Sequence, residues 1–222
     1  MLWLLWACGG QQEARDADLD GVRVEMQAHH AEADAAREAI IAGDLDGAKA
    51  SGAKLASRMP IPDLPAADQA AVKASAVSLS EAASLEVAAQ HFGALSVGCG
   101  QCHAARGVQP QLSAPTLPPV HEGFDAQMQR YHWAAERMWQ GLVLPSDAAF
   151  DEARAALRKI PTDGFRPQLD SRLPVGAESM DAAVHASAAA AGPGAGDAYG
   201  AMLLTCALCH LHSPASPAHD GQ

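Results

Sequence analysis

The stretch YGAMLLTCALCH (199–210) repeats an earlier one, FGALSVGCGQCH (92–103), and this repetition decides how the chain folds. Each copy runs from an aromatic residue through a Gly-Ala pair to a Cys-x-x-Cys-His run. A second block is duplicated too, since GVRVEMQAHHAEA (21–33) aligns with GFDAQMQRYHWAA (123–135). The blocks keep the same order, so the chain is an internal duplication in which each half opens on one block and closes on the other.

The composition favours helices. Alanine is abundant, aromatic residues make up 5% of the chain and β-branched runs are scarce, which is typical of helices that pack through small side chains. Asp44, Ser84 and Ser146 are predicted N-caps, and Gly43 and Gly107 are predicted helix stops. We predict an all-α protein of two tandem antiparallel four-helix bundles, with helices over 20–42, 45–58, 66–82 and 85–105, and then over 122–143, 147–159, 178–191 and 196–212.

A proline-rich stretch predicts the domain boundaries. The proline-rich stretch GVQPQLSAPTLPPV forbids a continuous helix and is the predicted linker between the bundles. The predicted organisation is an N-terminal segment and tether over 1–19, a first bundle over 20–106, a linker over 107–121, a second bundle over 122–213 and a tail over 214–222.

The opening MLWLLWACGG is a short apolar run that ends in Cys8. The order Leu, any residue, small residue, Cys resembles the lipobox of bacterial lipoproteins, although the run is short and lacks a basic region before it. Three interpretations stay open: lipidation of Cys8, the end of an ordinary signal sequence, or an incidental free thiol. The first two predict export to the periplasm, and the first predicts a membrane anchor through Cys8.

The formal net charge of −11 restricts the partners. An acidic surface is repelled by nucleic acid and by anionic membranes, so neither is expected as the main partner. A protein with a basic docking face would be attracted.

The two Cys-x-x-Cys-His runs allow three interpretations. A redox dithiol is expected after a strand, and no strand is predicted before either run. A zinc site shared by the two Cys pairs would leave the histidines without a role and would join two halves that look self-contained. Covalent haem c uses all the chemical residues that both copies retain, with two thioether bonds from the cysteines and an axial histidine on the iron. We therefore predict two covalent haems, held by Cys99, Cys102 and His103 and by Cys206, Cys209 and His210.

The sixth iron ligand is expected from the first helix of each half, because ligands in a four-helix bundle project inward from facing helices. The repeat offers Met26 or His30 in the first half and Met128 or His132 in the second, each pair on one helix face. We favour the histidines, because methionine is a routine filler of cores. Packing without coordination remains the alternative for all four.

Three neighbouring features complete the expected sites. His29 is less favoured as a ligand because its counterpart is a tyrosine, Tyr131. Trp133 and Trp139 are expected to pack against the second haem or its core. A charged cluster on the first helix is expected to be a solvated face: Glu32, Asp34, Arg37 and Glu38.

With ligand candidates on a first helix and Cys-x-x-Cys-His on a last one, residues 20–106 and 121–212 each resemble the class II cytochromes c, the family of cytochrome c-prime. The resemblance implies a four-helix bundle with the haem attached near its end. Some members leave the iron five-coordinate and bind small gases, and those with a distal methionine resemble low-spin electron carriers. A histidine in each first helix departs from both patterns and favours bis-histidine ligation at low potential.

The expected function is an exported dihaem cytochrome that carries single electrons between periplasmic redox proteins, without enzymatic activity. A haem-based gas-binding or sensor protein is the alternative. A dihaem peroxidase is disfavoured, because such enzymes need a longer chain and unlike haem domains.

Overall fold

The structure, a computed structural model, describes residues 9–61, 64–119, 124–160 and 194–212, together with positions 182 and 184. Within these residues all regular secondary structure is helical, which confirms the all-α class. No helix in the described part is both long and apolar enough to cross a membrane. The helices are α1 (Gly9–Ala42), α2 (Leu45–Ser57), α3 (Ala66–Ser80), α4 (Leu85–Ala105), α5 (Phe124–Val143), α6 (Asp147–Leu157) and α8 (Ala195–His212).

The predicted caps set the helix ends. The side chains of Asp44, Ser84 and Ser146 each accept a hydrogen bond from a backbone N–H in the first turn of the helix that follows, at 2.9, 3.3 and 3.3 Å. Gly43 and Gly107 follow α1 and α4 with φ angles of +78° and +63°. Because glycine adopts this left-handed conformation at low cost, both helices stop where predicted.

Helix α1 begins earlier than predicted, at Gly9 rather than at residue 20. The segment 9–19 was expected to be a tether, yet it is rich in helix-forming Gln, Glu, Ala and Arg and contains no proline, so the helix continues through it. Cys8, the tail 214–222 and the predicted helix 178–191, apart from positions 182 and 184, lie outside the described residues.

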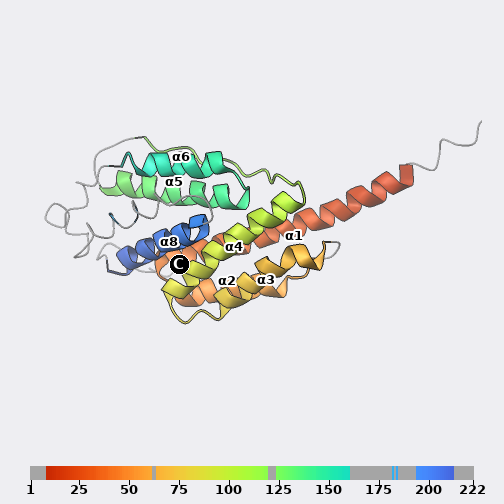
Figure 1. The fold of residues 1–222 in the computed structure, drawn as a ribbon, viewed down its shortest axis with the longest axis horizontal. Helices are drawn as coiled ribbons and strands as arrows, with labels where there is room; N and C mark the ends of the chain where they lie inside the picture. Colours follow the sequence, from red (N-terminus) through yellow and green to blue (C-terminus); the bar gives the residue numbers. More distant parts are fainter. Residues whose placement is uncertain are drawn as a thin grey trace, which may run out of the picture.

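The two halves pack against each other over a large area. Figure 1 shows α4 and α8, the helices that carry the Cys-x-x-Cys-His runs, next to each other, with α5 and α6 on one side and α2 and α3 on the other. Helix α1 packs on α8, and α5 packs on α4, more extensively than either packs on the last helix of its own half. The halves, which looked self-contained in sequence, therefore contact each other through equivalent helices.

Glycines bring α4 and α8 close together. A Cβ added at Gly93 would overlap the carbonyl oxygen of Gly196, and a Cβ added at Gly200 would lie 2.6 Å from the carbonyl oxygen of Ala89. Gly93 and Gly200 occupy equivalent positions of the repeat, as do Ala89 and Gly196. The same close contact is therefore made twice, once from each half.

Aromatic rings fill the space beside this crossing. Phe92 on α4 lies 6.3 Å from Tyr199 on α8 and 6.4 Å from Trp139 on α5, measured between ring centroids. All three side chains are buried. The core of the protein thus continues from one half into the other.

Arg37 contradicts the expectation of a solvated charged face. Its side chain is only 2% exposed, and its guanidinium Nη2 pairs with Asp34 at 2.9 Å, Glu38 at 2.7 Å and Glu136 of α5 at 3.2 Å. The guanidinium also lies 5.0 Å from the ring centroid of Trp139. The charge pattern along the chain could not predict this burial, because it is the second half that packs over this face of α1.

Candidate functional site

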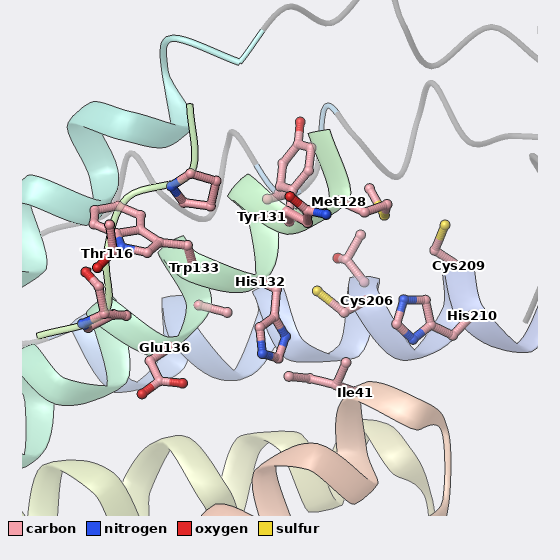
Figure 2. Close-up of a pocket in the computed structure, with 16 residues that line it drawn as sticks. Ile41, Thr116, Met128, Tyr131, His132, Trp133, Glu136, Cys206, Cys209 and His210 are labelled. Carbon is pink, nitrogen blue, oxygen red and sulfur yellow. The ribbon is translucent and has the colours of Figure 1, made fainter. Parts of the chain in front are cut away.

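A cavity of about 530 Å³ lies between α5 and α8 (Figure 2). This volume is in the range of pockets that bind organic ligands and cofactors. The linker closes part of the wall, and Ile41 at the end of α1 contributes from the first half. The lining is mainly apolar and contains the second Cys-x-x-Cys-His run together with both predicted sixth-ligand candidates: Met128, His132, Cys206, Cys209 and His210.

Helix α8 supplies the run. Cys206 and Cys209 are free thiols, and burial raises the pKa of Cys206 to about 12, so this thiol is neutral near pH 7. The pKa of His210 lies below its ordinary value because burial disfavours the charged ring, and neighbouring His132 acts in the same direction. A neutral imidazole keeps one ring nitrogen with a free lone pair, which is the form that binds iron.

Helix α5 supplies the opposite wall. Met128 and His132 are one helical turn apart, so both reach the cavity from the same face. Figure 2 shows His132 and His210 reaching into the same space from two helices. The structure therefore brings together the second Cys-x-x-Cys-His run and the two sixth-ligand candidates that the repeat nominated for the second half.

The linker is fixed along α5 by hydrogen bonds to its carbonyl groups. Trp133 Nε1 donates to the carbonyl of Pro115 at 2.9 Å, and Arg130 donates to that of Pro118 at 2.8 Å. Both prolines line the cavity. Trp133 lines this second-half cavity as predicted, whereas Trp139 packs between the halves.

In the first half, Cys99 and Cys102 are free thiols on α4, and burial raises the pKa of Cys99 to about 12. His103 follows them and lies against the end of α5, where its Nδ1 is 2.7 Å from the carbonyl oxygen of Val143. A carbonyl oxygen only accepts, so Nδ1 donates this hydrogen bond. Nε2 is then the ring nitrogen left to bind a metal.

The distal candidates of the first half are placed differently from those of the second. The His30 ring stacks on Trp139 of α5, and burial lowers its pKa despite the carboxylates of Asp34 and Glu136. His29 is buried, its Nδ1 lies 2.7 Å from the carbonyl oxygen of Glu25, and its Nε2 has no hydrogen-bond partner. The sequence favoured His29 less as a ligand because Tyr131 replaces it in the other half. The one feature that pointed to His29 was its position next to His30.

Protein side chains alone offer few metal ligands at either run. In the described part of the chain, no three His, Cys, Asp or Glu side chains converge closely enough to hold a metal ion. Each run instead presents two thiols and one imidazole, and in the second half these groups face a mainly apolar cavity. Two thiols and one imidazole beside a mainly apolar cavity are groups that can attach and ligate a cofactor.

Comparison with known proteins reveals no relative: the chain matches no protein-family model, no curated protein and no solved structure.

Proposed function

We propose that this protein is a dihaem c-type cytochrome that carries single electrons between redox proteins. The observation that supports this most is the cavity in which Cys206, Cys209 and His210 meet His132 and Met128. A Cys-x-x-Cys-His run beside an apolar cavity with a facing imidazole has the groups that covalent haem requires.

The residues of the second half have distinct roles in this proposal. Cys206 and Cys209 form the thioether bonds, and His210 is the proximal ligand. His132 is the sixth ligand, with Met128 as the alternative one turn away. The bound haem supplies one-electron exchange between ferric and ferrous iron, and two imidazole ligands favour a lower potential than an imidazole and a methionine.

The first half has the same roles by equivalence in the repeat. Cys99 and Cys102 attach the haem and His103 is the proximal ligand, with Nδ1 already held by a carbonyl. His30 is the proposed sixth ligand, with Met26 as the alternative. Each half then forms a four-helix bundle with one haem, resembling cytochrome c-prime, although the two bundles pack closely.

The chain's charge and N-terminus extend the proposal to partners and location. A net charge of −11 attracts a redox partner with a basic docking face and speeds their association at low salt. Covalent haem attachment accords with export to the periplasm, where lipidation of Cys8 would tether the protein to a membrane.

Two measurements on the purified protein test this function. Intact mass after expression with a haem-maturation system should show two covalent haems, and C99A/C102A should lose one of them. Visible spectra should then show low-spin bands in both oxidation states that carbon monoxide leaves unchanged. Protein without covalent haem would contradict the proposal, and a band at about 695 nm in the oxidised form would reassign the sixth ligand to methionine.

Gas binding or sensing is the second candidate. It is favoured by the exposure of His132, which lines the cavity at a solvent-accessible position. An exposed ring could leave the iron when a small ligand enters. High-spin bands and rapid carbon monoxide binding would support this function over electron transfer.

A further inference from the structure

The two proximal histidines contact the opposite half of the protein. His103 belongs to the first half, yet its Nδ1 donates to the carbonyl of Val143 in the second half at 2.7 Å. His210 belongs to the second half, and Ile41 of the first half lines the same cavity beside it, where the Ile41 backbone opposes the lowering of the His210 pKa by burial. Val143 and Ile41 are equivalent positions near the ends of α5 and α1. The repeat therefore places the same backbone position of the opposite half next to each proximal histidine.

Packing around each histidine holds this arrangement in place. A Cβ added at Gly100, inside the first Cys-x-x-Cys-His run, would overlap the carbonyl oxygen of Leu142 on α5. At the other site, the Leu211 side chain of α8 lies against Gly43, just after α1. The α4–α5 and α1–α8 contacts therefore fix each histidine relative to the carbonyl of the other half.

A carbonyl that accepts a hydrogen bond from the proximal imidazole changes that ligand in two ways. It fixes the ring's tautomer and orientation, and it makes the coordinating nitrogen more basic. A more basic ligand stabilises ferric iron over ferrous iron, so the hydrogen bond lowers the potential. Each half therefore carries a group that influences the iron of the other half.

We propose that Ile41 and Val143 are positioning residues, and that each half orients the proximal histidine and lowers the haem potential of the opposite half through one backbone carbonyl. This inference rests on the proposed haem function. It predicts that the two haem sites form a mutually dependent pair rather than two independent carriers in tandem.

The direct test is nuclear magnetic resonance on the full-length ferrous dihaem protein with ¹⁵N-labelled histidine, as the carbon monoxide adduct if the gas binds. The Nδ1 proton of His103 should show a nuclear Overhauser contact to the Hα of Leu144, which follows the Val143 carbonyl. The Nδ1 proton of His210 should show one to the Hα of Ala42. Contacts to residues of the same half in place of these would overturn the inference.

The variant Gly100→Ala tests the effect on the potential. Its Cβ must push α4 away from the backbone of α5, and the chain's second run already carries alanine at this place, Ala207, so the motif itself accommodates the change. The midpoint potential of the first haem should rise while that of the second stays unchanged, with site assignment by haem-methyl resonances.

Gly52→Ala is the matched control, because its Cβ would press on the backbone nitrogen of Ser80 at 2.9 Å, a contact within the first half between α2 and α3. It should leave both potentials unchanged. Equal shifts of the first haem's midpoint potential in Gly100→Ala and Gly52→Ala would overturn the inference. If Gly100→Ala does not fold, the nuclear Overhauser contacts of the wild-type protein decide whether the inference holds. A dihaem protein without these contacts refutes this inference alone, whereas protein without haem refutes the proposed function as well.

Discussion

The imidazole of His30 lies flat against the indole of Trp139, with ring centroids 4.9 Å apart and ring planes 6° apart. His30 is on the first helix of the first half, and Trp139 is on the first helix of the second. The candidate sixth ligand of one proposed haem is therefore positioned by the other half. His29 is buried nearby with an unpartnered Nε2, so variants of the two histidines can decide which one is the ligand of the proposed first haem.

His30→Ala should convert one of the two haems from low spin to high spin and make it bind carbon monoxide, because the iron loses its sixth ligand. His29→Ala should leave both haems low spin. Visible and electron paramagnetic resonance spectra of the two variants measure this. The opposite pattern would assign the ligand to His29 instead.

Under the gas-binding alternative, Trp133→Phe should speed carbon monoxide binding at the second haem. Phenylalanine keeps a large ring but cannot donate to the Pro115 carbonyl, so the linker loses a hydrogen bond where it walls the cavity. Flash photolysis measures the rebinding rate. Lys54→Ala, which removes a surface pair with Glu32 in the first half at 3.4 Å, is the control and should not change the rate.

Gly93→Ala should lower the free energy of unfolding by about 1–3 kcal/mol, because the new methyl group overlaps the α8 backbone at the helix crossing. The control is Gly21→Ala on α1, where nothing lies within 4 Å of the added Cβ. It should raise stability by up to about 1 kcal/mol through helix propensity alone. Urea unfolding of both variants tests the pair, and a stabilised Gly93→Ala would argue against the close crossing.

Arg37→Ala should cost about 1–3 kcal/mol, since it removes a buried guanidinium that pairs with three carboxylates, while the carboxylates are 30 to 47% exposed and keep part of their hydration. Arg58→Ala, which removes a pair with Glu25 at 3.5 Å in which both side chains are more than a third exposed, should cost less than about 1 kcal/mol. Denaturant unfolding gives both values. Similar costs would indicate that Arg37 is solvated after all.

Tyr199 should keep its proton well above pH 10. Burial raises the pKa of this phenol above its ordinary value of 10.0, and the charge of Arg37 only partly opposes the shift. The unfolded chain releases the proton first, so the contribution is intact below pH 10 and stability declines as the pH rises further. The chain has two tyrosines, so Tyr131→Phe with ¹³Cζ-labelled tyrosine isolates Tyr199, whose resonance should not titrate before the protein unfolds.

The helix ends could be predicted from the sequence because they depend on neighbouring residues along the chain. The caps Asp44, Ser84 and Ser146 act within one helical turn, and Gly43 and Gly107 stop helices through their own φ angles. The start of α1 was missed because composition alone does not mark where a tether ends and a helix begins.

The candidate site was partly predictable for a related reason. Duplication singled out the Cys-x-x-Cys-His runs and their facing helices, and the cavity gathers those residues in the second half: Met128, His132, Cys206, Cys209 and His210. The placement of His30 against Trp139 was not predictable, because a repeat aligns each half with the other and does not tell how the two pack.

By itself the sequence determined the all-α class, the helix stops and which residues form a potential cofactor set, since these follow from local propensity and internal repetition. Only the tertiary structure decided that α4 crosses α8 at glycines, that Arg37 is buried, and that His103 reaches the carbonyl of Val143. The physical reason is that small side chains permit close packing against many surfaces, and the surface that is chosen depends on complementarity between segments about a hundred residues apart.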